Sequence, residues 1–216
     1  MQWLCLGSAA LIAAFIAGRA FVPPEAPEPA SGRRSEFAFW GLIAIALLLM
    51  LIEDAGDPRH TLRSYVRVAF GEDDGGVFGT LSELLYFGVL ASIPLYAVAR
   101  YHHVLKANLR GRRYLIVAFV SYAVAVSLSF VGTAFSSVIG TNLYSEAGRV
   151  LYRISLLLGD DELGAFWSAW DTEEGWGFVR FYLMDSLVEE SIELLGAAAF
   201  LSATVAYLSS VLPGSD

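Results

Sequence analysis

The sequence contains very few of the residues that most metal, redox and cofactor sites require. Its single cysteine, Cys5, cannot form an internal disulfide and lacks the spaced partners of a metal or redox motif. Its single lysine, Lys106, lies in a short basic loop, which argues against a retinal-type Schiff base inside a span. Histidine occurs only as His60, His102 and His103, too few for a histidine-rich membrane metallohydrolase. A Gly-x-Ser-x-Gly elbow, a P-loop and a dinucleotide fingerprint are also missing.

Positive charge is scarce as well. The chain has 14 Lys and Arg against 22 Asp and Glu, a net charge of −8, whereas proteins bind nucleic acids and anionic lipid surfaces through excess Lys and Arg. We therefore expect no nucleic-acid partner. What the chain has in abundance is apolar side chains, at 56% of residues with only 17% charged, which is too apolar for a soluble domain. We predict an all-α integral membrane protein whose first partner is the lipid bilayer.

Apolar stretches of spanning length recur along the chain. About 20 helical residues cross a hydrocarbon core about 30 Å thick. The first stretch has no basic start and no small-residue cleavage site, so we interpret it as a retained helix rather than a signal peptide. Prolines at 23, 24, 27 and 29 predict an extended linker over residues 22–35. The sequence predicts one membrane domain over residues 1–216, a bundle of five helices at 1–18, 37–52, 81–99, 114–139 and 187–212.

The distribution of charge predicts how these spans are oriented. No acid occurs between Glu83 and Glu146, while Arg and Lys crowd the loop joining the third and fourth spans. By the positive-inside rule this loop is cytoplasmic. The N terminus is then expected outside and the C terminus in the cytoplasm. The longer connections, 53–80 and 140–184, both lie on the outer face in this topology.

Each outer connection contains an amphipathic stretch. In the first, apolar residues at helical spacing oppose arginines at intervals of four: Leu62, Tyr65, Val66, Ala69 and Phe70 against Arg59, Arg63 and Arg67. In the second, the apolar set is Val150, Leu151, Ile154, Leu157 and Leu158, followed by an aromatic stretch from 166 to 182. Aromatic and amphipathic segments are typical of the headgroup level of a bilayer. We therefore predict interfacial helices on the outer face.

The last span begins with a cluster of carboxylates. Asp185, Glu189 and Glu193 are spaced four apart, which places them on one face of an α-helix. Glu190 adds a fourth acid, and residues 194–212 then carry no charge. The cluster is expected near the water interface.

The run Glu189, Glu190, Glu193, Gly196 and Ala197 resembles the opening of the last span in uncharacterised multi-pass prokaryotic membrane proteins. The resemblance covers about an eighth of the chain. It implies a polytopic fold in a prokaryotic cell membrane and brings no activity with it. The Glu189-Glu190 pair is also similar to the pair that opens the motif of membrane-embedded CAAX-type proteases, but the following arginine and the later histidine motifs are missing. We carry no catalysis over from that likeness.

Acids at the outer ends of three spans suggest a common site. If those spans are neighbours, their carboxylates converge, and they must then bind a cation or proton or pair with arginines. The leading hypothesis is an outer-side acidic pocket for a cation or proton, in a small channel, transporter or ion-sensing subunit. Its expected ligands are Glu193, Glu189, Glu83, Asp185 and Glu53, with Arg180 and Arg63 as counter-charges.

Three alternatives remain open. Acids at span ends can simply be hydrated and mark the edge of the lipid. The protein can also be an accessory or assembly subunit of a larger membrane complex that docks through its aromatic stretch, whereas a homo-oligomer would favour the channel or transporter. The third alternative is a metalloenzyme acting on outer-leaflet lipid, with Glu189 and Glu190 as acid and base and a metal held by Glu53, Asp54 or His60. We lean away from an enzyme because no nucleophile or complete ligand set is recognisable.

Overall fold

The computed structural model describes residues 1–21, 30–71, 77–106, 108–130, 143–159, 161–174 and 178–212. Over these residues the chain is helical almost throughout and contains no β-strand, which confirms the predicted all-α class. Several predicted features lie outside the described residues: the four prolines of the linker, the predicted end of the fourth span beyond residue 130, and Trp176 in the aromatic stretch.

Among the described residues, five helical segments are long and apolar enough to cross a membrane, the number predicted from the sequence. Four of them are α1 (Gln2–Phe21), α2 (Ala30–Gly56), α4 (Val77–Tyr101) and α5 (Leu109–Phe130). The fifth is a continuous segment, Phe178–Val211, made of α9 (Phe178–Tyr182), the π-helical η3 (Leu183–Glu189) and α10 (Glu190–Val211). Shorter helices lie between them: α3 (Pro58–Phe70), η1 (Val104–Lys106), α7 (Leu143–Leu158) and α8 (Asp161–Glu174).

The second apolar helix is longer than the sequence predicts. It begins at Ala30, inside the stretch 22–35 interpreted as a linker, and ends at Gly56 rather than near residue 52. Proline disfavours helix only up to Pro29, and the polar residues that follow it can form helical hydrogen bonds although they do not add to an apolar pattern. The apolar pattern therefore marks the membrane-compatible part of α2 and not its full length.

The chain divides into two compact units. The first comprises Met1–Val120 and Leu194–Asp216, and the second comprises Ser121–Glu193. Each unit has its own packing and is described separately.

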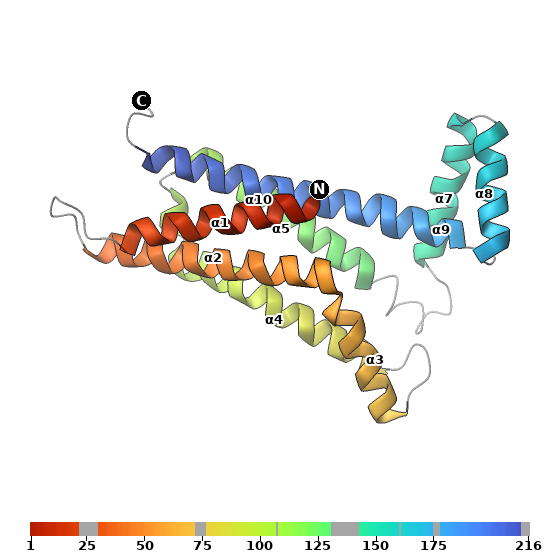
Figure 1. The fold of residues 1–216 in the computed structure, drawn as a ribbon, viewed down its shortest axis with the longest axis horizontal. Helices are drawn as coiled ribbons and strands as arrows, with labels where there is room; N and C mark the ends of the chain where they lie inside the picture. The colour runs from red at the N-terminus through yellow and green to blue at the C-terminus, as the bar shows by residue number, and fades with distance from the viewer. Residues whose placement is uncertain are drawn as a thin grey trace. The chain divides into compact units, whose positions relative to one another are not determined.

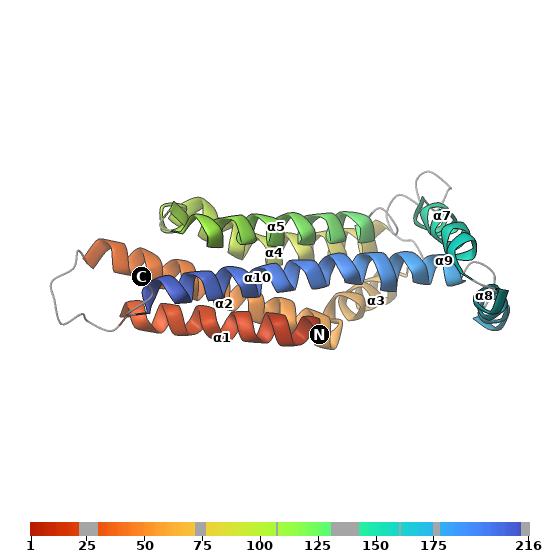
Figure 2. The ribbon, with the colours of Figure 1, turned by 90° about the horizontal axis from the view of Figure 1, so that it is seen from above.

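The first unit is built on the antiparallel pair of α1 and α2, which lie side by side (Figures 1 and 2). Small and apolar side chains at intervals of three and four on α1 are at most 4% exposed: Leu6, Ala9, Ala13, Ile16 and Ala17. On α2 the residues Phe39, Trp40, Ile43 and Leu47 are fully buried. Alanines at such a contact let two helix backbones approach closely, and in lipid this packing replaces the hydrophobic drive of soluble proteins.

One end of this unit is held by contacts between α10, η1 and the start of α5. The ring of Tyr207 lies 4.8 Å from that of Trp40, and its hydroxyl donates to the carbonyl of Leu105 at 3.2 Å. Gly111 leaves room for this ring, because a Cβ there would lie 2.5 Å from Cε2 of Tyr207. The Asn108 amide Nδ2 donates to the carbonyl of Ala206 at 2.8 Å, while its Oδ1 accepts from the Gly111 N–H at 2.8 Å. Asn108 therefore caps α5 and also ties it to α10.

These two roles of Asn108 can be separated by substitution. We expect Asn108→Ala, which loses both hydrogen bonds, to lower the free energy of unfolding by about 1–2 kcal/mol. Asn108→Asp keeps the cap but loses the donor to Ala206, so its free energy of unfolding should lie between those of the parent protein and Asn108→Ala. Thermal unfolding in detergent measures the order. Equal stability of Asn108→Ala and the parent protein would show that neither bond matters.

The second unit contains α7, α8 and the first half of the last segment. The ring of Trp170 lies 5.8, 5.5 and 4.7 Å from those of Trp167, Phe178 and Tyr182, so part of the predicted aromatic stretch forms a packed cluster. Gly148 of α7 lies directly against α9, since a Cβ at this position would lie 2.0 Å from the carbonyl oxygen of Arg180. Only glycine permits this approach of two backbones.

Candidate functional site

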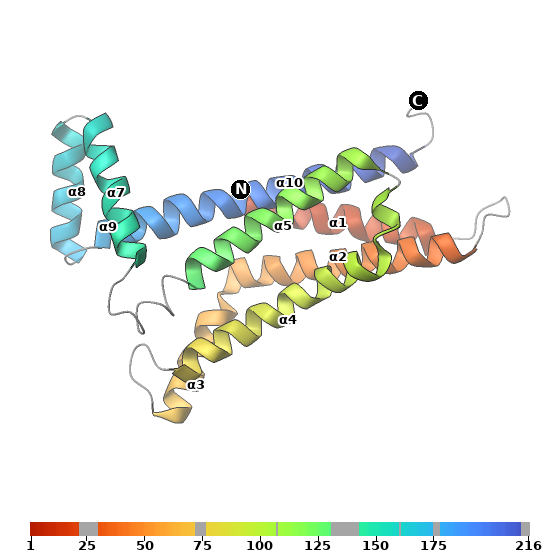
Figure 3. The same ribbon diagram turned by 180° about the vertical axis from the view of Figure 1, so that it is seen from behind.

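The candidate site of the first unit begins with a sharp turn between α2 and α3. Asp57 adopts the left-handed conformation (φ 47°, ψ 46°) and its N–H donates to the carbonyl of Glu53 at 2.9 Å. Asp tolerates this conformation better than most residues. Pro58 then occupies the first turn of α3, where its fixed φ favours a helix start. The turn sends α3 along the first part of α4 (Figure 3).

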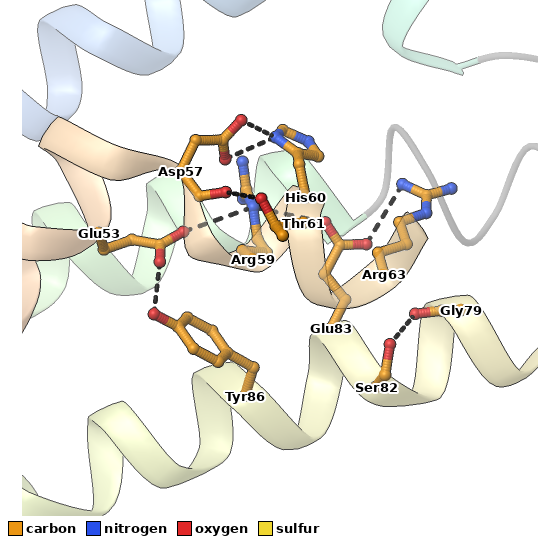
Figure 4. A network of polar contacts seen from close by, with 10 residues as sticks. All are labelled: Glu53, Asp57, Arg59, His60, Thr61, Arg63, Gly79, Ser82, Glu83 and Tyr86. Atoms are coloured by element: carbon orange, nitrogen blue, oxygen red, sulfur yellow. Dashed lines mark hydrogen bonds and ion pairs between the residues drawn. The ribbon is translucent and has the colours of Figure 1, made fainter. Parts of the chain in front are cut away.

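Glu83 of α4 is the centre of a polar cluster between α3 and α4. Its side chain is only 6% exposed, yet each carboxylate oxygen faces a guanidinium. Oε2 lies 3.3 Å from Nη1 of Arg63, and Oε1 lies 3.5 Å from Nε of Arg59 (Figure 4). Because the arginines are one helical turn apart on α3, one carboxylate can bridge both.

Glu53, in the last turn of α2, joins the same cluster. The hydroxyl of Tyr86 donates to its Oε2 at 2.5 Å, and Nε of Arg59 lies 3.7 Å from its Oε1. The guanidinium of Arg59 also lies over the ring of Phe87, 5.1 Å from its centroid, a favourable position for a cation. Five residues from three helices thus form what we name the Glu83 network: Glu53, Arg59, Arg63, Glu83 and Tyr86.

The Glu83 network is balanced in charge, with two carboxylates and two guanidiniums. The Glu53, Arg59 and Arg63 side chains are 15%, 17% and 18% exposed, so their pairing is only weakly screened by water. Removing one member of such a group leaves an uncompensated buried charge. A cation could bind here only by displacing an arginine. The arrangement is therefore suited to fixing α3 against α2 and α4.

Sequence reasoning found some members of this network and missed others. Glu53 and Glu83 were expected ligands and Arg63 an expected counter-charge. Tyr86 was not expected, although it lies three residues after Glu83 and so on the same helix face. Gly79 was also missed. A Cβ at this position would lie 2.9 Å from Cγ of Arg67, so this glycine lets the arginine stems lie flat on α4.

The expected ligands of the last span lie in the second unit. Glu189 is 7% exposed, Asp185 and Glu193 are partly buried and Glu190 is exposed. Each of Asp185, Glu189 and Glu193 takes part in further interactions. Arg180, an expected counter-charge, lies in α9, where its carbonyl oxygen meets Gly148.

The backbone around these acids differs from the prediction. Asp185 and Glu189 lie inside the π-helical η3, and the N–H of Glu190 donates to the carbonyl of Asp185, five residues earlier. The prediction that Asp185, Glu189 and Glu193 share one face assumed α-helical spacing throughout, which does not apply across this turn. Hydrophobic and charge patterns give no signal for a π-turn. Such turns occur frequently at functional sites.

Metal ligands are not gathered in the part of the chain that the structure describes. No three His, Cys, Asp or Glu side chains there are placed to hold a metal ion. His60, a ligand in the enzyme alternative, lies at the surface with Nδ1 2.7 Å from both carboxylate oxygens of Asp57. Glu53, a second ligand in that alternative, is engaged by Tyr86 and Arg59. Comparison of this chain with known protein families, curated proteins and solved structures finds no match.

Proposed function

We propose that the chain is an integral membrane protein of five spans that binds a proton at Glu189, as a small proton-coupled channel or transporter or as a proton-sensing subunit. The N terminus lies outside and the C terminus in the cytoplasm in this proposal, with Glu189 near the outer face. The observation that carries the proposal is a carboxylate, 7% exposed, inside a π-helical turn of a long helical segment, directly before the uncharged residues that could cross a membrane. Such π-helical turns occur frequently at functional sites.

A proton suits this position better than a metal cation. Hard cations take six or more oxygen ligands, several of them from carboxylates, whereas a proton needs one carboxylate. Among the described residues no three acidic, histidine or cysteine side chains are placed for a metal. Asp185 and Glu193 are then neighbours that influence the proton electrostatically rather than metal ligands.

Glu53 and Glu83 have a different role in this proposal. Both carboxylates are already compensated by Arg59 and Arg63 within hydrogen-bonding or ion-pair distance. Protonating or metallating either one would leave a guanidinium without its partner. We therefore assign the Glu83 network to holding α3 in place, and the ion to Glu189.

The experiment that tests the proposal compares Glu189→Gln with Glu190→Gln. The two residues are adjacent and chemically identical, but Glu189 is buried and Glu190 is exposed. Thermal unfolding in detergent is measured across pH 4–8 and again with Na⁺, Ca²⁺, Mg²⁺, Mn²⁺ and Zn²⁺. We expect Glu189→Gln to reduce the pH dependence of the melting temperature and Glu190→Gln to preserve it, because a buried carboxylate links protonation to folding more strongly than an exposed one. Glu53 and Glu83 contribute equally in both variants.

Two outcomes of this comparison would contradict the proposal. One is a pH dependence that Glu189→Gln leaves unchanged. The other is saturable stabilisation by one metal ion that Glu189→Gln abolishes. This result would mean that the site binds a metal cation rather than a proton.

The charge balance of the Glu83 network favours a second candidate function. A protein that uses its buried acids to fix one helix on two others behaves as a scaffold, and this fits an accessory or assembly subunit of a membrane complex. Mild solubilisation followed by size-exclusion chromatography and mass spectrometry tests this hypothesis. A stoichiometric, unrelated partner would favour the accessory role, and a defined homo-oligomer would favour a self-contained channel or transporter.

A further inference from the structure

The exterior of α3 has three chemically different sides. Its arginines face α4, where Arg59 and Arg63 meet Glu83. A second side carries Leu62, Tyr65 and Ala69, all exposed, with Tyr65 73% and Leu62 37% exposed. A third side carries His60 and Ser64, which are also exposed, and Val68, 83% exposed, lies between Ser64 and Tyr65 around the helix. At about 3.6 residues per turn, Ser64 lies roughly half a turn away from Leu62.

The charged side of α3 packs against α4, together with Phe70, whose ring lies 4.7 Å from that of Phe78, whereas Leu62, Tyr65 and Ala69 stay exposed. An amphipathic helix of a soluble protein turns its apolar stripe toward the core, yet no residue of α3 is buried. Gly79 makes the opposite arrangement possible, because the stems of Arg63 and Arg67 lie within 3.4 Å of where its Cβ would be. The exposed apolar side of α3 is therefore available to contact lipid or another protein.

The chain connections of α3 indicate that this contact is with lipid. Only Asp57 separates α3 from the end of α2, and α4 follows Gly71 after a short connection. Both α2 and α4 contain span-length apolar segments, Gly32–Gly56 and Phe78–Tyr101. A helix that joins the same ends of two spans, and packs beside Gly79, Glu83 and Phe87 in the first turns of one of them, lies at the outer edge of the bilayer if those spans are inserted.

The engaged arginines limit how α3 can bind lipid. Most interfacial helices combine apolar burial with attraction between free Lys or Arg and anionic headgroups. Here the Arg59 and Arg63 guanidiniums lie 3.3–3.7 Å from the carboxylates of Glu53 and Glu83. A lipid phosphate would have to compete with these partly buried carboxylates.

We infer that α3 docks on the outer surface of the bilayer through Leu62, Tyr65 and Ala69, and that acyl chains rather than anionic headgroups provide the contact. The inference rests on the membrane insertion included in the proposed function. His60 and Ser64 face water, and the Glu83 network sets the rotation of the helix about its axis. The partner is a lipid surface of any headgroup charge.

Site-directed spin labelling tests this orientation. In a Cys5→Ser background, single cysteines replace Leu62, Ala69 or Ser64 on α3, and Val89 on α4, which is 64% exposed. Each nitroxide-labelled protein is reconstituted in phosphatidylcholine vesicles with or without phosphatidylglycerol. Collisions with oxygen, which partitions into lipid, are compared with collisions with a water-soluble nickel chelate. Thermal unfolding of each labelled protein verifies that it is folded.

The expected result is a severalfold higher ratio of oxygen to nickel collisions at 62 and 69 than at 64, unchanged by phosphatidylglycerol. The label at Val89 distinguishes failure of membrane insertion from failure of α3 docking. If the label at 89 is exposed to nickel, membrane insertion itself is wrong. If 89 is in lipid while 62 and 69 collide with nickel as often as 64, insertion stands and the docking of α3 is wrong.

Two further results would overturn the inference. Labels at 62 and 69 that neither reagent reaches would mean that protein covers this side of α3. Oxygen accessibility that appears only with phosphatidylglycerol would mean that anionic headgroups, and not acyl chains, hold the helix.

Discussion

Glu83→Gln is expected to destabilise the protein by about 3–5 kcal/mol, the usual effect of removing one partner from a buried ion pair. The side chain is 6% exposed and faces two guanidiniums at 3.3 and 3.5 Å. Without its charge, Arg59 and Arg63 stay in a poorly hydrated position and lose the carboxylate that faces both of them. Chemical or thermal unfolding in detergent measures the loss.

An exposed ion pair supplies the matched control for this prediction. Glu146 and Arg149 of α7 are 2.7 Å apart, but their side chains are 45% and 41% exposed. The same substitution, Glu146→Gln, should therefore cost at most about 1 kcal/mol. Combining Glu83→Gln with Arg63→Gln restores the charge balance and should cost less than the sum of the two single changes. Equal effects of Glu83→Gln and Glu146→Gln would refute the role assigned to the Glu83 network.

The second large effect is expected from Gly148→Ala. The added Cβ would lie 2.0 Å from the Arg180 carbonyl oxygen and 2.7 Å from its carbonyl carbon. Backbone atoms cannot move aside as a side-chain tip can, so α7 and α9 must separate. Overpacking of this kind costs about 1–3 kcal/mol and sometimes more. Limited proteolysis across the second unit, combined with thermal unfolding, measures the effect.

Gly88→Ala is the matched control because a Cβ at Gly88 of α4 has no atom within 4 Å. Alanine is a better helix former than glycine by about 1 kcal/mol, so this change should leave stability unchanged or raise it. Tolerance of Gly148→Ala, with protease sensitivity like that of Gly88→Ala, would mean that α7 does not contact α9 as closely as described.

Much of the architecture could be predicted from the sequence because it depends on composition over long windows. Apolar stretches of spanning length predicted five helices, and the part of the chain that the structure describes contains five helices of that length and composition. The spacing of Arg59, Arg63 and Arg67 predicted an amphipathic helix after Pro58, and α3 occupies Pro58–Phe70. These signals are local and repeat along the chain, so no knowledge of neighbouring helices is needed.

The details of the site could not be predicted because they depend on backbone geometry and on which helices are neighbours. The sequence suggested Arg63 as a counter-charge, but the pattern of α3 does not say which carboxylate its arginines face, because that depends on how α3 packs against α4. The left-handed Asp57 and the π-turn at Asp185 and Glu189 are single-residue or single-turn features without a periodic signature. The role of Gly148 could not be predicted either, because it depends on the close approach of the α9 backbone.

The most direct test of a proton at Glu189 is infrared difference spectroscopy of the reconstituted protein through a pH jump. A carboxyl group that takes up a proton gains the C=O stretching band of a carboxylic acid. We expect one component of this band, present in the parent protein and in Glu190→Gln, to be missing in Glu189→Gln, while the other acids of the chain contribute alike in all three proteins. An unchanged band in Glu189→Gln would place the proton on another group and contradict the proposed function.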